Sequence, residues 1–555
     1  MTVRTTDRSR ISRRGKRFLV PLRIFVSAFC FFAFAAGFLG VGRFFDLLFT
    51  FFGATQLFPG AVRLAGGLFG GTAAATLAIL FLTVLFGRFY CSSLCPLGTA
   101  QDAASFFGHR KGRGFSYSPG ILYLRALSLA AVVIAFAAGA SPLAGFLDPY
   151  SLTARFLQYA LVPLFDLSKN LLAPLARNFD LYWLNDFGGF SIWATVAAAA
   201  TVPFILALAF FRGRVFCNSL CPVGAVLGPL NGIALFQVRF DAKTCVSCGA
   251  CARVCKAECL DTTRRRLDAS RCVSCFSCLA TCPTGSLTYS RKLWAKESDI
   301  DPTAVPDPAR RKFLKKTGSS GAGVALALVS APVARAAQSL APNLQPLAPA
   351  APPGAVSLVR FLSSCTACGL CVSKCPSGVL RPSIVKYGPR GFLMPYLDYD
   401  ASYCQYDCTL CTDLCPTGAL KKLTLDDKRL VQMGTAALVT EKCIVFTKKT
   451  ACGACAEHCP TGSVRMIPAP TGIPEPAFDS AICVGCGACH HICPAEPDKS
   501  ITVTGKSVQG KALPPTKNLF GNPESSLSNS PFGLPRSAPE GKTPSRPPKG
   551  EDFPF

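Results

Sequence analysis

The spacing of its cysteines constrains this chain more than any other feature. Of 30 cysteines in 555 residues, 24 fall into six runs of four. The runs are Cys245, Cys248, Cys251 and Cys255; Cys272, Cys275, Cys278 and Cys282; Cys365, Cys368, Cys371 and Cys375; Cys404, Cys408, Cys411 and Cys415; Cys443, Cys452, Cys455 and Cys459; and Cys483, Cys486, Cys489 and Cys493. Disulfide frameworks belong mostly to small secreted domains. A regular pattern over a long chain instead predicts metal ligands.

The spacing within the runs is that of [4Fe–4S] ligands. In two-cluster bacterial ferredoxins, C-x2-C-x2-C-x3-C-P gives three thiolates to one cluster and the fourth to the other. The runs that begin at Cys272, Cys365 and Cys483 match this pattern fully, and the runs from Cys404 and Cys443 have a wider first gap. Four-cysteine zinc sites are the alternative, but they separate two C-x2-C pairs by a longer loop. The six runs therefore predict six [4Fe–4S] clusters.

Two local details leave alternatives open. Cys255 is followed by Lys256 where proline is usual, so Cys259, four residues later, is an alternative ligand to Cys255. Cys486 to His490 also fits the haem attachment pattern C-x-x-C-H. Because that pattern overlaps a full ferredoxin motif, we interpret it as coincidence.

The fourth cysteine of each run is expected to complete the site of a partner run. Within 241–290 the two runs exchange Cys255 and Cys282. The last four runs resemble the four-cluster ferredoxin subunits of respiratory reductases, which implies that outer runs pair and inner runs pair. The crossing ligands would then be Cys493 to the run from Cys365, Cys375 to the run from Cys483, Cys459 to the run from Cys404, and Cys415 to the run from Cys443. Pairing of consecutive runs is the alternative.

Four apolar stretches precede the cysteine runs. They lie near 18–40, 66–87, 121–143 and 190–211, each long enough to cross a hydrocarbon core of about 30 Å as a helix. Seven basic residues precede the first stretch, and short loops rich in Lys and Arg orient membrane helices with those loops in the cytoplasm. We therefore assign the net charge of +27 to membrane topology and predict no binding of nucleic acid.

An internal repeat links the second and fourth apolar stretches. The segment from Arg88 to Gly98 recurs 126 residues later, from Arg214 to Gly224. Each copy carries a C-x3-C-P motif, Cys91 and Cys95 in the first and Cys217 and Cys221 in the second. Two similarly oriented helix pairs would bring these four cysteines to one membrane face. A seventh metal site, two disulfides and free thiols all remain open for them.

The predicted fold is an α-helical membrane bundle, with four helices plus a candidate fifth, joined to two ferredoxin-like α+β iron–sulfur domains. Arg310 and Arg311 begin a twin-arginine export motif, R-R-x-F-L-K, although a fifth membrane helix with positive flanking charge is the alternative. The predicted segments are a basic N-terminus (1–17), the membrane domain (18–240), a two-cluster domain (241–290), a linker with the export motif (291–338), a second linker (339–359), a four-cluster domain (360–505) and a disordered tail (506–555).

The first 290 residues resemble the NapH/MauN group of membrane ferredoxins, through the two C-x3-C-P motifs and the following eight cysteines. The remainder resembles NapG/MauM, an exported four-cluster ferredoxin. Together the resemblances imply a multi-pass protein of the bacterial inner membrane, with 241–290 cytoplasmic and 339–555 periplasmic. They imply electron transfer from quinol, or from a cytoplasmic reductant, to a periplasmic reductase or cytochrome, with a quinone as a candidate further cofactor.

The sequence offers no catalytic residues. It has no glycine-rich nucleotide fingerprint, no nucleophile paired with a base and no carboxylate pair. A role as a component of a quinol dehydrogenase remains open on this basis, and an assembly factor for a respiratory metalloenzyme is the alternative function.

Overall fold

The computed structural model describes residues 13–39, 51–68, 70–110, 114–165, 167–168, 192–241, 244–291 and 349–514. Two compact units result, Met1–Leu513 and Pro514–Phe555, and apart from Pro514 the second lies outside the described residues. The twin-arginine motif, the candidate fifth helix and residues 515–555 of the predicted disordered tail also lie outside them.

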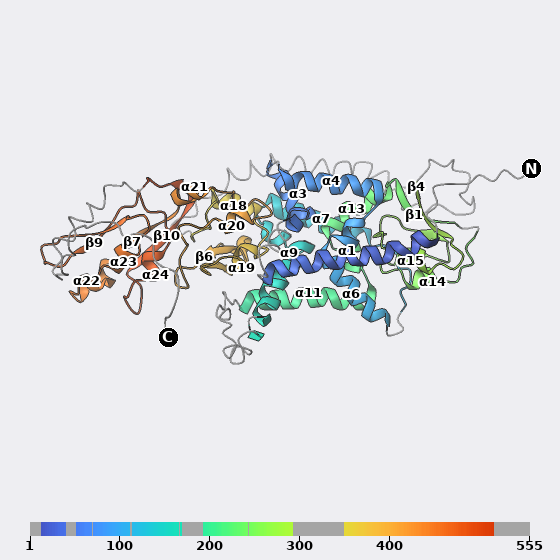
Figure 1. Cartoon of the computed structure of the whole chain (residues 1–555), viewed down its shortest axis with the longest axis horizontal. Coiled ribbons are helices and arrows are strands. Elements are labelled where there is room, and N and C mark those ends of the chain that lie inside the picture. Colours follow the sequence, from blue (N-terminus) through green and yellow to red (C-terminus); the bar gives the residue numbers. More distant parts are fainter. Residues whose placement is uncertain are drawn as a thin grey trace, which may run out of the picture. The chain divides into compact units, whose positions relative to one another are not determined.

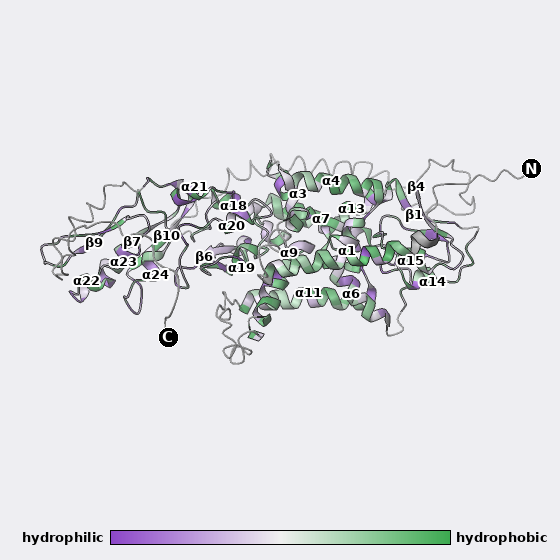
Figure 2. Cartoon of the chain, in the orientation of Figure 1, coloured by the Kyte–Doolittle hydropathy of each residue, from purple (hydrophilic) through white to green (hydrophobic). Residues whose placement is uncertain are grey.

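The four predicted apolar stretches coincide with four helices, α1 (Arg13–Leu39), α4 (Gly71–Phe86), α7 (Leu122–Ala137) and α11 (Ile192–Arg212). Long apolar runs without acidic residues form helices that bury only part of their surface here. Phe25, Phe81 and Phe204 are each more than 60% exposed, and Figure 2 shows hydrophobic colour along α1, α4 and α11. Of these helices, Phe18–Phe38 and Ile192–Arg212 are both long and apolar enough to cross a membrane, whereas α4 and α7 have 16 residues each.

Shorter helices connect and cover these four. They are α3 (Leu57–Ala65), α5 (Phe89–Ser93), α6 (Pro96–Arg110), α8 (Ser141–Ala144), α9 (Pro149–Phe156), the π-helix η1 (Leu157–Leu161), α12 (Val215–Ser219) and α13 (Pro222–Gly232). Helix α11 packs against α6 and α9, and α13 packs against α4 and α7. Figure 1 shows α1, α4 and α11 running along one common direction.

The first cysteine-rich region is a small α+β fold. Its elements are β1 (Phe236–Phe240), α14 (Ala250–Arg253), β2 (Leu260–Asp261), β3 (Arg266–Leu267), α15 (Ser277–Thr281) and β4 (Leu287–Arg291). Strand β1 pairs antiparallel with β4, and β2 with β3. The outer pair therefore joins the two ends of the region and closes it around both cysteine runs.

The second cysteine-rich region consists of two further α+β halves. Its first half contains α18 (Leu358–Ser364), α19 (Leu370–Ser373), β5 (Leu380–Pro382), η3 (Pro389–Gly391), β6 (Pro395–Leu397), α20 (Leu410–Asp413) and α21 (Leu425–Leu430). Its second half contains β7 (Val431–Leu438), η4 (Thr440–Lys442), α22 (Ile444–Thr447), α23 (Ala454–Glu457), β8 (Val464–Ile467), β9 (Glu475–Phe478), α24 (Ala488–His491) and β10 (Ile501–Lys511). The antiparallel pairs are β5 with β6, β8 with β9, and β7 with β10.

The predicted bounds of this domain, 360–505, are too narrow at both ends. Strand β10 continues to Lys511, so the predicted tail begins too early. At the other end, Ala350, Ala351 and Ala355 are at most 5% exposed, and the amide of Gln509 donates to the carbonyl of Val356 at 2.8 Å. Part of the predicted linker is therefore packed against β10, where small alanine side chains allow close approach of the two segments.

Candidate metal centres

Four cysteines of the first region surround an open space of about 320 Å³. Cys245, Cys248 and Cys251 come from the loop before α14, and Cys282 follows α15. The loop turns sharply at Gly249, whose φ of +72° lies in the left-handed region that glycine adopts without strain. The predicted exchange of Cys282 is therefore seen in the structure.

Five cysteines line the neighbouring space of about 330 Å³. Cys272, Cys275 and Cys278 are joined there by both Cys255 and Cys259. The sulfur atoms of Cys255 and Cys259 lie 3.5 Å apart, and this hydrogen bond lowers the pKa of the Cys255 thiol. The structure thus brings both candidate fourth ligands to one site.

The last four runs pair in consecutive order, and the predicted pairing of outer with outer runs is wrong. Cys443, Cys452 and Cys455 share a space of about 340 Å³ with Cys493. Burial raises the pKa of the thiols of Cys371, Cys411 and Cys489, and neighbouring thiols add to the effect. These neighbours complete three further sets: Cys365, Cys368, Cys371 and Cys415; Cys404, Cys408, Cys411 and Cys375; and Cys483, Cys486, Cys489 and Cys459.

Chain connectivity explains the consecutive order. Each exchange joins runs that are adjacent in sequence, which costs less loop-closure entropy than joining the first run to the last. The pairing of β7 with β10 then encloses the third and fourth runs in one closed unit. Spacing within the runs is the same for either arrangement, so the sequence pattern could not distinguish them.

The donor sets fit [4Fe–4S] clusters. Each comprises at least four thiols, and for three of the six sets they line an open space in the protein. Cysteine thiolates are the ligands that [4Fe–4S] clusters take in ferredoxins. Among the described residues, no three His, Cys, Asp or Glu side chains converge on a single metal ion.

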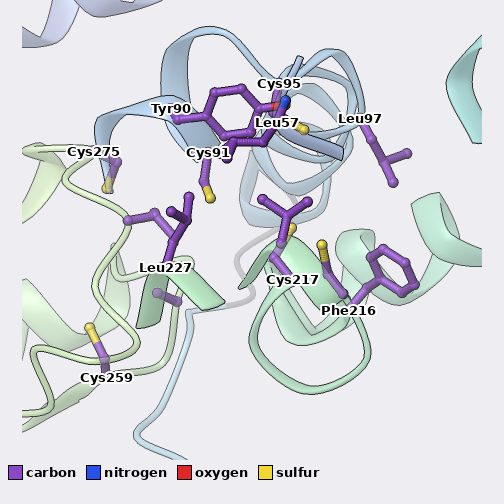
Figure 3. Packing of buried hydrophobic residues seen from close by; sticks show 14 of the residues in the cluster. Leu57, Tyr90, Cys91, Cys95, Leu97, Phe216, Cys217, Leu227, Cys259 and Cys275 are labelled. Carbon is purple, nitrogen blue, oxygen red and sulfur yellow. The ribbon is translucent and has the colours of Figure 1, made fainter. Parts of the chain in front are cut away.

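The repeated C-x3-C-P motifs form a separate buried group, which we call the repeat core: Cys91, Cys95, Cys217 and Cys221. All four are at most 5% exposed and are free thiols, so disulfides are absent among them. Figure 3 shows Cys91, Cys95 and Cys217 in one packed region. Cys221 lies close enough for Cys217, Cys95 and Cys91 to add to the burial that raises its pKa. The structure thus brings the cysteines of the two repeats together, and their position at a membrane face stays a prediction.

Two arginines of the repeats cross to the opposite copy. Arg214 donates to the carbonyls of Cys91 and, at 3.0 Å, Gly98. Arg88 donates to the carbonyl of Cys217 at 3.5 Å and to Asn218 Oδ1 at 3.2 Å. Both side chains are 0% exposed. Both arginines are therefore part of the packing between the two repeats.

Close approach of the backbones explains the glycine at the end of each repeat motif. A Cβ atom on Gly98 would lie 2.3 Å from the carbonyl oxygen of Cys91, and one on Gly224 would lie 2.0 Å from that of Cys217. Helices α6 and α13 therefore begin in direct contact with the cysteine-bearing turns. The same geometry in both copies makes the repeat core a two-fold arrangement.

The repeat core adjoins the site of Cys272. Arg88 Nη1 donates to the carbonyl of Ser270 at 3.2 Å, and Asn231 Nδ2 donates to the carbonyl of Cys272 at 2.9 Å. Asp102 holds this end of the helices together through ion pairs with Arg23 at 2.7 Å and Arg214 at 2.8 Å. Burial opposes ionisation of Asp102, but its cationic neighbours outweigh burial and hold its pKa well below the usual range.

A second contact region, which the sequence analysis missed, surrounds the loop of Cys365. Arg155 donates to the carbonyls of Thr366 at 2.8 Å and Ala367 at 2.9 Å, and it is 2% exposed. Ser141 Oγ lies 2.8 Å from the carbonyl of Cys365. Burial lowers the pKa of Arg155 to about 10, so its guanidinium stays charged at neutral pH. The sequence offers one local signal for the helix that carries Arg155: Asp148 before Pro149 marks the start of α9.

Comparisons with known proteins agree with these sites. A family model described as "4Fe-4S binding domain" matches residues 69–114 and 193–241, which contain the repeat core. Another, described as "4Fe-4S dicluster domain", matches 364–419 and 449–496. These two segments separate the first two C-terminal runs from the last two, as the consecutive pairing does. No solved structure matches the chain.

Curated relatives cover about a third of this chain and most of their own length. The ferredoxin-type protein MauM of Methylophilus methylotrophus is 32% identical over 215 residues, 35% of this chain and 88% of that protein. MauM of Methylorubrum extorquens is 34% identical over 206 residues, 34% of this chain and 87% of that protein. The ferredoxin-type protein NapG of Escherichia coli is 30% identical over 218 residues, 35% of this chain and 85% of that protein. The chain therefore belongs to the family of ferredoxin-type proteins that includes MauM and NapG, and it is a [4Fe–4S] electron-transfer protein.

Proposed function

We propose that this chain is an electron carrier of the bacterial inner membrane that links a cytoplasmic two-cluster domain to a periplasmic four-cluster domain, in which six [4Fe–4S] clusters supply one-electron redox centres. It would fuse a NapH/MauN-type membrane protein to a NapG/MauM-type partner. Electrons would come from quinol or a cytoplasmic donor and leave to a periplasmic reductase.

One observation carries this proposal: the two cysteine-rich regions contact opposite ends of the same helix. Just before the start of α7, the amide of Ser118 donates to the carbonyl of Glu258 in the first region at 3.4 Å. Just after the end of α7, Ser141 Oγ contacts the carbonyl of Cys365 in the second region. A helix of 16 residues rises about 24 Å, at about 1.5 Å per residue.

The surface of the helices supports a lipid environment. Soluble monomers rarely expose large continuous apolar areas. Here α1 exposes Phe25, Phe29 and Phe32, and α11 exposes Trp193, Val196, Phe204 and Phe211. Hydrocarbon would cover these side chains, while α4 and α7 would need local thinning of the bilayer or short polar ends to span it.

The opposite location of the two regions requires export of the second. Arg310 and Arg311 lie between them in sequence and supply a twin-arginine motif, a signal for export. The cysteine runs on the two sides of that motif would then hold their clusters on different sides of the membrane.

Reporter fusions test this topology. Alkaline phosphatase fused after Arg291 should be inactive and after Leu513 active, because the enzyme requires an oxidising compartment for its disulfides. Replacement of Arg310 and Arg311 by lysine should abolish the activity of the fusion after Leu513. Equal activity of both fusions would refute the two-sided arrangement. Reduction of the EPR-detected clusters by added menaquinol in the purified protein tests the quinol donor.

A further inference from the structure

We propose that the first cysteine-rich region binds an acidic soluble electron-transfer protein at the hairpin of β2 and β3, beside the cluster site of Cys245. The proposal rests on the proposed function, which places this region in the cytoplasm and leaves its electron donor open. One electron would pass from the reduced partner to the cluster, which oxidises the partner and neither makes nor breaks a bond. Exposure of the ligand loop and the charge of the hairpin carry the proposal.

The cluster site of Cys245 reaches the protein surface. Of the 30 cysteines, all of which lie in the part of the chain that the structure describes, Cys248 alone is exposed. Val246, two residues earlier in the same ligand loop, is 65% exposed. The neighbouring site adjoins the helices instead, since Asn231 of α13 donates to the carbonyl of Cys272 at 2.9 Å. Because electrons cross protein only over short distances, a soluble partner has its most direct access at Cys248.

Three consecutive arginines, Arg264, Arg265 and Arg266, border this exposed loop. All three are exposed, and Arg265 Nε donates to Ser247 Oγ of the ligand loop at 3.3 Å. Asp261 lies 3.9 Å from Arg264, but it also accepts hydrogen bonds from two backbone amides of the turn. One carboxylate beside three guanidinium groups leaves the hairpin with net positive charge. The exposed loop and its basic border therefore match the apolar centre and polar rim of a protein–protein contact.

The backbone of the turn points to a function for Arg265. Its φ of +50° lies in the left-handed region, which glycine adopts without strain and other residues do not. Stability alone therefore favours glycine at this position. Residues held in such conformations cluster at functional sites. A guanidinium next to the ligand loop can bind carboxylates of a partner through paired hydrogen bonds.

Membrane topology does not account for these arginines. Positive charge orients a membrane helix when it lies within about 15–20 residues of the end of that helix, and Arg264 is much farther along the chain from Arg212, where α11 ends. Anionic lipid is the other ligand that exposed arginines bind. A lipid headgroup would not explain why the charge lies at the exposed edge of a redox site, with Thr262 of the same turn lining that site. The observations therefore favour a protein partner.

Binding and electron-transfer rates of the purified full chain test the proposal. The probe is an acidic [2Fe–2S] ferredoxin, oxidised for equilibrium binding and reduced for stopped-flow reduction of the clusters. The triple variant Arg264→Gln/Arg265→Gln/Arg266→Gln should weaken binding and slow reduction by about 10-fold at low salt, and added salt should diminish the difference. Its reduction by uncharged photoreduced deazariboflavin should match that of the wild type.

A matched control removes the same charge from the second cysteine-rich region. Lys386→Gln/Lys421→Gln/Lys448→Gln alters three exposed lysines there and should change neither ferredoxin binding nor the reduction rate. Arg265→Gly separates the side chain from its structural role. It relieves the backbone strain, so the thermal unfolding temperature should not fall, whereas ferredoxin binding should weaken by about threefold.

Equal ferredoxin binding by the wild type and the arginine triple variant would overturn the proposal. If that variant keeps ferredoxin binding but loses phosphatidylglycerol that co-purifies with the wild type, the arginines bind lipid, which also overturns it. The reporter fusions separate this result from failure of the proposed function. An active phosphatase after Arg291 would refute the cytoplasmic location itself, whereas an inactive one with unchanged ferredoxin binding would refute only the docking surface.

Discussion

Replacing Arg155 by methionine should loosen the loop of Cys365 and shift the redox potential of its cluster. The variant removes two charged hydrogen bonds, to the carbonyls of Thr366 at 2.8 Å and Ala367 at 2.9 Å. Hydrogen bonds to a charged group contribute about 1.5–3 kcal/mol each. Relief of the buried charge offsets part of this, so we expect a net loss of about 2–4 kcal/mol in the stability of this contact.

The same change removes a positive charge beside Cys365 and Cys368. Loss of about 1–2 kcal/mol of charge interaction corresponds to about 40–90 mV for a one-electron couple. The cluster would become harder to reduce, and its potential would fall. Arg155→Lys keeps the positive charge, so the potential should fall by only part of this amount. It should still lose the paired donation to the two carbonyls, because lysine lacks the planar fork of arginine.

Two measurements on the full chain check this prediction. Hydrogen exchange should increase at 362–369, and an EPR redox titration should show one potential lowered. Arg465→Met is the control, because Arg465 is partly exposed and 3.9 Å from Asp479, where a surface pair contributes less than about 1 kcal/mol. Unchanged exchange together with a shift below about 10 mV would refute the role assigned to Arg155.

Three further variants test the described sites. Asp102→Asn should destabilise the chain by about 3–5 kcal/mol, because it leaves Arg214 and Arg23 buried without their acid. Since the pKa of Asp102 is lowered in the fold, the stabilisation by its carboxylate is present above about pH 4 and is lost as pH falls. An acid-unfolding curve that is the same for the wild type and the variant would contradict this. Gly98→Ala should cost about 2–3 kcal/mol by overpacking against Cys91, whereas Gly232→Ala, with nothing within 4 Å of the added Cβ, should leave the thermal unfolding temperature unchanged. Cys255→Ser should lower the iron content by about four atoms per chain, and Cys259→Ser should leave it unchanged, because Cys255 has the x3 spacing of the other crossing ligands. Loss of iron in Cys259→Ser alone would assign Cys259 as the ligand.

The sequence predicted well those features that short segments determine. Apolar stretches near 18–40 and 190–211 appear as α1 and α11, because uninterrupted apolar runs leave the backbone to satisfy its own hydrogen bonds. The cysteine runs likewise gather around common spaces, since close spacing lets one loop carry three ligands.

Features that depend on contacts between distant segments were missed. The pairing of β7 with β10 brings the runs from Cys443 and Cys483 into one unit, and nothing within either run encodes it. Arg155 lies in an unremarkable stretch of sequence, and its role arises only when α9 meets the loop of Cys365. Arg88 opens the first repeat motif, and it is buried only because the two repeats, 126 residues apart in sequence, pack against each other.

Exchange of the fourth cysteine has a consequence for how the protein is assembled. In each pair of runs, neither site has its full ligand set until the other loop is also folded into place. Loading of one cluster therefore prepares the neighbouring site, and loss of one weakens the other. Maturation intermediates of the ferredoxin domains should accumulate with two, four or six clusters, and oxidative damage should remove clusters in twos.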